Sequence, residues 1–356
     1  MIFSNVRTVI GCMAFIIISA CSKLSLPGAA GNPGEGESLL TINLTGDSES
    51  KASGAEHGIQ AEDNYINTLE IFIFHAEGNK AGKLDAYKKF TPADGIRNLQ
   101  IKATTGRKKM YVVANSHRGG WPGVNTLPEF QQERALLQED NVKDYLMTGE
   151  ADVTLQVATS VTLPVSRLVA RVCLASIKGA FRGTPYEGCK LSNVKAYLIN
   201  VHGVKHIHDG SLAVPVILNP KAPEETDINS CAMPGMLFEA VPAEIEDTGY
   251  TTPHYFYTYE NRLETETERN RFTRLVIQAD LNGNTYYYPV NINQPGYGYT
   301  ALNAHRGVKR NTSYEIHVTI LRPGSIDPDQ PMEHGALSVN LNVLDWNTLP
   351  VANPEF

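Results

Sequence analysis

The chain has 356 residues, a formal net charge of -7 at pH 7, and a composition that is 42% hydrophobic and 19% charged. This length predicts two compact domains, and 29 glycines with 20 prolines indicate a turn-rich globular protein, which excludes a wholly disordered chain. No stripe of lysine and arginine interleaved with aromatic residues offsets the negative charge, which argues against a nucleic-acid partner.

The first residues have the pattern of an export signal. Arg7 precedes an apolar run over residues 9–20 that is too short to span a bilayer. The run ends in small residues that lead directly into Cys21, as in a bacterial lipobox. We therefore expect a signal peptide over residues 1–21 and acyl chains on Cys21, which would tether the exported protein to a membrane. The alternative is cleavage without lipid.

A short amphipathic strand is predicted next. Residues 22–38 are rich in glycine and proline and lack periodicity, which is typical of a flexible tether. Leu40, Ile42 and Leu44 then alternate with polar residues, the pattern of a strand with one buried face.

A polar segment, residues 46–67, follows this strand and is long enough to be a loop that either functions or is cut. Lys51 is its only lysine or arginine. Cleavage after Lys51 would separate the strand from its domain, and a strand from another subunit could then take its place. The alternative is an ordinary first strand followed by a long loop.

The rest of the first domain is predicted to be mostly β-structure. Residues 69–75 are nearly continuous β-formers, as expected of a central strand covered on both faces. One helix is predicted from a capping box of Thr126 and Glu129 with Pro128 in the first turn, and we expect it to cover a sheet. The other expected strands are residues 98–104, 110–115, 152–157, 161–165 and 168–177.

A second series of strands predicts a second sandwich, because strands recur at short intervals with little helix. Chain breakers over residues 180–190 suggest the domain boundary, and Asn282-Gly283 predicts a tight hairpin. Residues 220–270 are polar and aromatic, and we expect surface loops there. The expected strands are residues 194–201, 212–218, 275–281, 285–292, 314–321 and 337–344.

Three cysteines remain after Cys12 and Cys21 are assigned to the signal, and an odd number is no disulfide framework. Cys173 lies in an apolar strand and is predicted to be a small core residue. Cys189 and Cys231 either pair in an oxidising compartment or stay free.

No catalytic or cofactor motif is found among nucleophile elbows, phosphate loops, zincin helices and dinucleotide fingerprints, so we predict no enzyme, no catalytic residues and no cofactor. His202, His206 and His208 are the best metal candidate, but a polar strand end explains them better. Asp327 and Asp329 fit a rigid proline turn better than a calcium loop. We therefore predict no metal site.

Two tyrosine-rich runs, Tyr255–Tyr259 and Tyr286–Tyr288, have the composition of an aromatic platform for sugars. Tyrosine is also an ordinary strand residue, which is the favoured interpretation.

Several segments together resemble the fimbrillin family, the FimA-like subunits of type V pili in Gram-negative oral and gut bacteria. The resemblance covers nearly the whole chain and depends on the joint order of its motifs. They are the lipobox at Cys21, the early strand, the cuttable loop, and the segments over residues 69–74, 110–115, 164–172, 310–320, 323–328 and 343–346.

The resemblance implies an all-β fold of two transthyretin-like β-sandwich domains, here with one short helix in the N-terminal domain. It also implies lipoprotein export to the outer membrane and removal of the first strand by a trypsin-like or arginine-specific protease. The bond cut would be Lys51-Ala52. Lysine departs from the family's usual arginine, which puts an arginine-specific enzyme in doubt.

Donor-strand exchange, also implied by the resemblance, would bring the C-terminal segment of a neighbouring subunit into the vacated groove. The candidate donor offers Leu349, Val351 and Phe356, although Pro350 and Pro354 would interrupt a ladder. The strand predicted at residues 337–344 alternates better, but its own domain needs it.

The resulting prediction is the shaft subunit of a cell-surface fimbria, which assembles with copies of itself and related subunits and supports adhesion. The alternatives are a tip or accessory adhesin that binds a host or glycan ligand, and a monomeric glycan-binding surface lipoprotein. The predicted division is a signal peptide (1–21), a propeptide with the removable strand (22–51), an N-terminal domain (52–182) and a C-terminal domain with the donor tail (183–356).

Overall fold

The computed structural model describes residues 36–46, 65–91, 94–142, 144–208, 212–268, 270–294, 305–330, 332, 336–346 and 351–352. All of them belong to one compact unit, Glu35–Phe356. Within the described part of the chain, no helix is long and apolar enough to cross a membrane. The predicted lipidation and processing residues, Cys21, Lys51 and Ala52, and two candidate donor residues, Leu349 and Phe356, lie outside the described residues.

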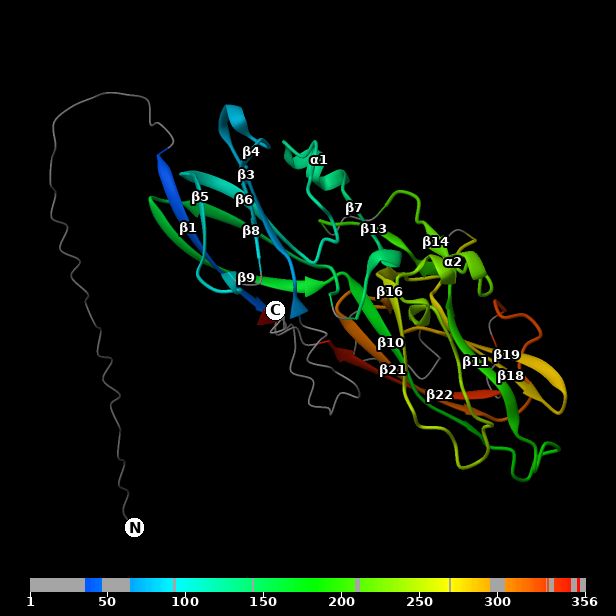
Figure 1. Ribbon diagram of the computed structural model, residues 1–356. Helices are drawn as coiled ribbons and strands as arrows, with labels where there is room; N and C mark the ends of the chain where they lie inside the picture. The colour runs from blue at the N-terminus through cyan, green and yellow to red at the C-terminus, as the bar shows by residue number, and fades with distance from the viewer. Residues whose placement is uncertain are drawn as a thin grey trace, which may run out of the picture. The chain divides into compact units, whose positions relative to one another are not determined.

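The N-terminal sandwich is formed by one seven-stranded sheet in the order β4-β3-β6-β8-β9-β1-β5 (Figure 1). The predicted strand at residues 69–75 is confirmed as an interior strand, and all seven of its residues are buried. The strands are β1 Glu37–Gly46, β3 Leu69–His75, β4 Leu84–Phe90, β5 Leu99–Thr104, β6 Gly106–Ala114, β8 Met147–Leu155 and β9 Ala158–Arg167.

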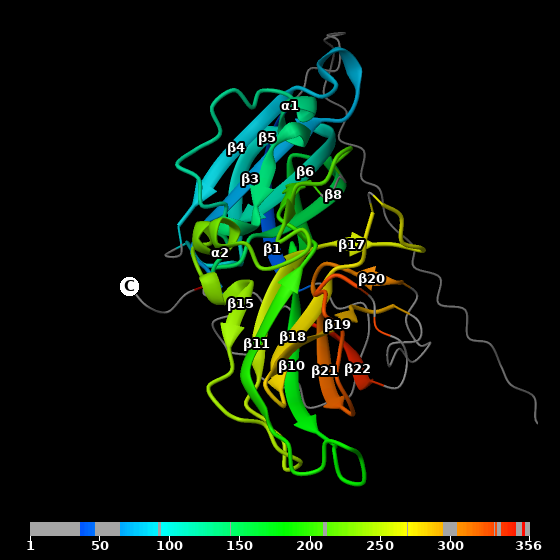
Figure 2. The same ribbon diagram turned by 90° about the vertical axis from the view of Figure 1, so that its right-hand side faces the viewer.

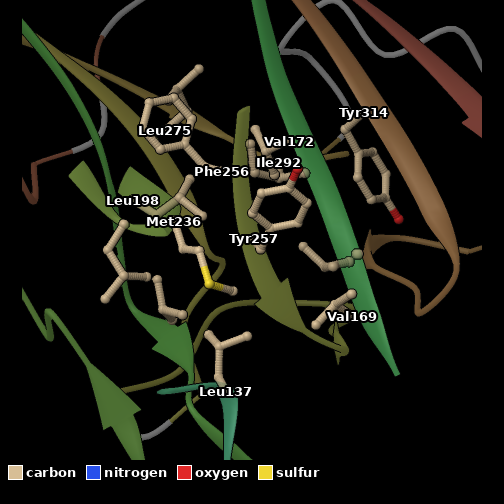
Figure 3. Close-up of a cluster of buried hydrophobic side chains, with 14 of the residues drawn as sticks. Leu137, Val169, Val172, Leu198, Met236, Phe256, Tyr257, Leu275, Ile292 and Tyr314 are labelled. Atoms are coloured by element: carbon tan, nitrogen blue, oxygen red, sulfur yellow. The ribbon is translucent and has the colours of Figure 1, made fainter. Parts of the chain in front are cut away.

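The C-terminal sandwich has two four-stranded sheets, β16-β10-β21-β22 and β15-β11-β18-β19. Figure 2 shows β10, β21 and β22 side by side, and Figure 3 shows apolar side chains of the two sheets packed together, with Val172 and Phe256 near Leu198 and Leu275. The strands are β10 Val169–Gly179, β11 Leu191–Ile199, β15 Phe238–Ala240, β16 His254–Tyr259, β18 Arg274–Leu281, β19 Asn284–Asn291, β21 Thr312–Ile320 and β22 Leu337–Asp345.

Eight short strands form four further two-stranded sheets, β12 with β14, β13 with β7, β17 with β20 and β2 with β23. They are β2 Tyr65–Ile66, β7 Arg134–Leu136, β12 Val201–His202, β13 Val204–His206, β14 Ile217–Leu218, β17 Asn261–Arg262, β20 Gly307–Val308 and β23 Val351–Ala352. The helices are α1 Leu127–Gln132 and α2 Glu225–Ser230, with 3-10 turns at Gly78–Lys80, Leu137–Glu139 and Pro234–Met236.

The predicted capping box is confirmed at α1, where Thr126 and Glu129 satisfy each other's backbone N–H groups. The helix covers the N-terminal sheet as expected, because the ring of Phe130 packs 4.8 Å from that of Phe72 and 4.9 Å from that of Tyr111. The apolar face of the helix was expected to extend through Leu137, but α1 ends at Gln132, and Leu137 lies in the 3-10 turn that follows β7.

The expectation of surface loops over residues 220–270 was wrong. This segment contains α2, β15, β16 and β17, and β16 pairs with β10 so that Phe256 and Tyr259 are buried. The aromatic run forms a strand because tyrosine and phenylalanine favour strands and fill the space beside β10.

The change from one sandwich to the other occurs at Leu168, between β9 and β10. The predicted division at residues 182 and 183 does not coincide with this change, because β10 pairs with β16 and β21 of the C-terminal sandwich.

Arg310 connects the two sandwiches. Its guanidinium group donates to the Thr148 hydroxyl at 2.9 Å and the Ser166 carbonyl at 2.7 Å.

Candidate functional site

Strand β1 occupies the interior of the N-terminal sheet although it comes first in the described chain. It pairs parallel to β9 over Leu39–Gly46 and antiparallel to β5 over Glu37–Ile42. Its backbone donates to both sides, from Leu39 to the Val157 carbonyl at 3.0 Å and from Leu44 to the Ile96 carbonyl at 3.1 Å. Ladder bonds therefore fix β1 along two neighbours at once.

The alternation predicted for β1 is confirmed by the burial of its side chains. Leu40, Ile42 and Leu44 are 0%, 0% and 1% exposed, whereas Leu39 is 41% exposed. Burial of each inward side chain contributes about 1.5–3 kcal/mol. The three pack in one cluster with buried residues of the other strands, including Leu69, Ile71, Ile73, Phe90, Leu99, Ile101, Met110, Val112, Leu163 and Val165.

Both neighbours of β1 depend on it for backbone pairing. Among the described strands, β5 pairs with β1 alone. β9 pairs with β8 at only two positions, Met147 with Arg167 and Thr148 with Ser166. We call the space that β1 fills, between Ala158–Val165 of β9 and β5, the β1 slot. Its occupant completes the sheet, so an empty slot would expose two unpaired strand edges.

The other end of the chain is anchored at Trp346, whose side chain is fully buried. The guanidinium groups of Arg167 and Arg171 lie 4.2 and 4.9 Å from its ring centre. Arg167 also donates to the backbone carbonyl of Trp346 at 3.1 Å, and the backbone N–H of Trp346 donates to the Asn311 carbonyl at 3.1 Å. This buried tryptophan fixes the point from which the C-terminal segment departs.

Beyond Trp346, the backbone of β23 runs parallel to β2, with Val351 opposite Tyr65 and Ala352 opposite Ile66. Val351, a candidate donor residue, is therefore placed beside β2 and not in the β1 slot of its own chain. The strand with better alternation, β22, pairs with β21 over its full length, Leu337–Asp345. It belongs to its own sandwich, as expected from the sequence.

The histidine candidates are only partly brought together. The rings of His206 and His208 lie 5.6 Å apart, whereas His202 is on β12, where burial lowers its pKa to about 4. No group of three or more His, Cys, Asp or Glu side chains suited to a metal ion occurs among the described residues.

The two aspartates considered for calcium are engaged by protein groups. Arg274 donates to a carboxylate oxygen of Asp329 at 3.0 Å, and Arg271 forms a second ion pair with the same carboxylate. Asp327 accepts the N–H of Asp329 at 2.9 Å, which closes the turn. Two guanidinium groups therefore neutralise Asp329.

The tyrosine runs do not form an exposed platform. Tyr257, Tyr259 and Tyr288 are buried, and the remaining tyrosines of the two runs are half-buried. Their rings contribute to the core of the C-terminal sandwich, so a sugar cannot stack on the buried ones.

The three cysteines of the described chain are free. Cys173 is buried on β10, which confirms its expected place in the interior. Cys231 is also buried, and burial raises the pKa of its thiol to about 11.

A buried carboxyl group, Asp140, joins the two sandwiches. It accepts the N–H of Leu146 and the hydroxyl of Tyr259, both at 2.9 Å, and His117 lies 3.9 Å away. Burial raises the pKa of Asp140 to about 6, although these neighbours oppose the rise. Nothing in the sequence around Asp140 indicates this contact, because Tyr259 follows 119 residues later.

Asp140→Asn is expected to change how stability depends on pH. The pKa of this carboxyl group is higher in the folded protein than in the unfolded chain, so its contribution to stability is full below about pH 4 and is lost as pH rises through 6. The variant lacks this loss, and its unfolding free energy relative to wild type should rise by about 2–3 kcal/mol between pH 4 and 7. Urea titrations at several pH values measure the difference, and a difference independent of pH would contradict the assignment.

Comparison with known proteins decides the family. The model of the major fimbrial subunit protein FimA matches residues 38–207, and that of the FimA4 pilin C-terminal domain matches residues 255–346. The chain belongs to the fimbrillin family. The expected fold class, two β-sandwiches, is also that of this family: a fimbrilin (FimA) structure from Porphyromonas gingivalis W83 aligns with a TM-score of 0.62 at 19% identity, covering 87% of this fimbrillin and 98% of that chain.

Curated relatives of this fimbrillin include two major fimbrium subunits of Porphyromonas gingivalis. FimA type-5 is 33% identical over 105 residues, which are 27% of each chain. FimC is 24% identical over 338 residues, which are 92% of this fimbrillin and 66% of FimC. The matched part is therefore less than two thirds of either relative.

Proposed function

We propose that this fimbrillin is a structural subunit of a cell-surface fimbrium and that β1 is a plug exchanged for a strand of another subunit. The observation that carries the proposal is the position of β1, which fills an interior slot yet is joined to the remaining strands only through residues 47–64. One cut in that segment is enough to separate β1 covalently from its sheet.

The energetics of β1 favour exchange over spontaneous release. The three buried side chains contribute about 1.5–3 kcal/mol each, and each ladder bond adds about 1 kcal/mol. A strand held this firmly leaves only slowly after cleavage, so the slot is open only briefly before another strand takes over the same contacts. Cleavage then makes exchange possible without leaving the slot empty for long.

The proposed processing steps combine the sequence signals at Cys21 and Lys51 with what the fimbrillin resemblance implies. Cys21 carries the lipid that holds the precursor at the outer membrane, and a trypsin-like protease cuts Lys51-Ala52, the only lysine or arginine position between β1 and Tyr65. The piece cut away therefore runs from the lipidated Cys21 through the propeptide, residues 22–51, and contains Leu40, Ile42 and Leu44.

The proposed donor is the segment after Trp346 of a second copy. Leu349 and Val351 are spaced two apart, like the inward residues of β1, so both can point into the slot. Two copies joined in this way leave one free tail and one free slot, which allows a shaft to grow.

A tip subunit is the second candidate, and the prolines of the tail favour it. Pro350 and Pro354 lack the N–H groups that a ladder uses, so the tail forms fewer bonds than β1 does. A tip subunit would accept a strand without donating one and would keep its adhesive role for a host or glycan ligand.

Trypsin treatment of the chain without residues 1–21 tests the proposal, with Lys51→Gln as the matched control. We expect a new N-terminus at Ala52 by sequencing, followed by oligomers in size-exclusion chromatography and filaments in electron microscopy. Lys51→Gln should stay intact and monomeric. A cut protein that remains monomeric for days overturns the shaft assignment, and one that also fails to take up another subunit's tail overturns the exchange mechanism.

A further inference from the structure

Removal of β1 leaves β5 with no backbone partner among the described strands, since β5 pairs with β1 alone. β5 is nevertheless one of the two walls of the slot that a new strand must enter. The other wall, β9, continues through Leu168 into β10 and is held by the C-terminal sandwich. Something other than a ladder must therefore hold β5 while the slot is open.

A largely buried group of four polar side chains connects Thr104, the last residue of β5, to β4. Asp85 of β4 accepts both the N–H and the hydroxyl of Thr104 at 2.9 Å. Lys108 of β6 lies 2.9 Å from the Asp85 carboxylate and donates to the Thr104 hydroxyl at 2.7 Å. His75 of β3 is 3.0 Å from the Lys108 ammonium and 3.3 Å from Asp85. We call these four residues the Asp85 cluster.

The Asp85 cluster connects the two end strands of the N-terminal sheet. β4 and β5 are the two ends of the seven-stranded order, so the contact between Asp85 and Thr104 joins strands that share no ladder (Figure 2). Thr104 is also the residue opposite Glu37, the first residue of β1. The cluster therefore holds β5 at the end where β1 begins, and none of its side chains belongs to β1.

The charges of the cluster favour a persistent contact. The side chains of Lys108 and Asp85 are 1% and 5% exposed. Burial alone would raise the pKa of Asp85, but hydrogen bonds from Lys108 and Thr104 lower it below its usual value. The carboxylate is therefore ionised at neutral pH, and hydrogen bonds to an ionised acceptor in a poorly solvated site are stronger than neutral ones.

We propose that the Asp85 cluster keeps β5 in place as a wall of the β1 slot after β1 has left, so that the cut subunit stays able to accept a strand. This inference rests on the proposed exchange function, and it assigns Asp85, Lys108 and Thr104 as positioning residues. A second contact, from the exposed Lys88 ammonium to the Gln100 carbonyl at 2.9 Å, holds β5 near its first residue, at the end opposite Thr104.

The test compares wild type with Asp85→Leu/Lys108→Met, a pair that replaces the buried ions by apolar groups of similar size. Asp85→Asn is the conservative variant, because its amide oxygen still accepts the Thr104 N–H. Asp152→Asn is the matched control. Asp152 of β8 forms an ion pair with Lys109 of β6 at 3.3 Å, and this pair lies outside the Asp85 cluster.

Hydrogen exchange of residues 99–104 is measured in the full chain and in cut protein from which β1 has been removed in mild denaturant. With β1 present, the double variant should match wild type. Without β1, its exchange should be roughly 10- to 100-fold faster, with Asp85→Asn in between and Asp152→Asn unchanged. Equal protection of β5 in all stripped proteins overturns the inference.

Rebinding of a synthetic peptide with the sequence of β1, Glu37–Gly46, separates this inference from the proposed function. The stripped wild type should bind the peptide, and the double variant should bind it roughly tenfold more slowly. If wild type itself binds no strand, the exchange function fails. If wild type and the double variant bind equally fast, only the role of the Asp85 cluster fails. Should the double variant not fold, Asp85→Asn against Asp152→Asn gives the same comparison.

Discussion

Replacing Ile42 with aspartate is expected to make assembly independent of proteolysis. Ile42 is fully buried at the middle of β1, between Leu99 of β5 and Val161 of β9. The change removes about 1.5–3 kcal/mol of apolar burial, and a carboxylate placed there without a partner costs several kcal/mol more. The strand should leave its slot although it remains covalently attached, and the open slot can then accept the tail of another copy.

The matched control is Leu39→Asp. Leu39 lies three residues before Ile42 on the same strand, and its side chain faces solvent. Leu39 is 41% exposed, so an aspartate there remains hydrated and β1 should stay in place. Size-exclusion chromatography with intact-mass measurement distinguishes the two: uncut Ile42→Asp should form oligomers and uncut Leu39→Asp should not. Monomeric, fully stable Ile42→Asp would contradict the role of β1 as the plug.

Trp346→Ala is expected to give the largest loss of stability in the C-terminal sandwich. The ring is fully buried, with Arg167 and Arg171 stacked on it and the ring of Tyr145 at 5.3 Å. Removal leaves a cavity and two buried guanidinium groups without their aromatic partner, and large-to-small changes of this kind cost about 3–5 kcal/mol. Denaturant titration measures the loss.

The chain offers a matched control in its other tryptophan, Trp121, which is half-buried and stacks with Arg118 at 4.6 Å. Trp121→Ala should lower the unfolding free energy clearly less than Trp346→Ala does, because water can fill the space that the half-buried ring leaves. Trp346→Phe should recover part of the stability, since it keeps an aromatic face toward Arg167. Equal losses for the two alanine variants would show that Trp346 is not a special anchor of the C-terminal segment.

The parts of the fold that sequence predicted well are those whose signal is local. The alternation of Leu40, Ile42 and Leu44 reports burial directly, because successive strand residues face opposite sides. The capping box at Thr126 and the Asn282-Gly283 hairpin, with φ of 51° and 78°, depend on neighbouring residues alone.

Other features depend on partners that are far apart in sequence. β4 carries exposed lysines and little alternation, so its place at a sheet edge is not visible before β3 is known to pair with it. The change of sandwich at Leu168 lacks a chain breaker, because β9 leads almost directly into β10. The Asp85 cluster joins four strands through residues that show no common motif.

The most direct test of strand exchange mixes two defective subunits that have complementary parts. One is cut after Lys51 and lacks residues 347–356, so it has an exchangeable slot but no donor. The other carries Lys51→Gln, so it keeps its plug and has a tail. We predict a complex of one copy of each by native mass spectrometry, and no longer polymer. Absence of the complex, or complexes formed by the tail-less chain alone, would contradict donation of the C-terminal segment into the β1 slot.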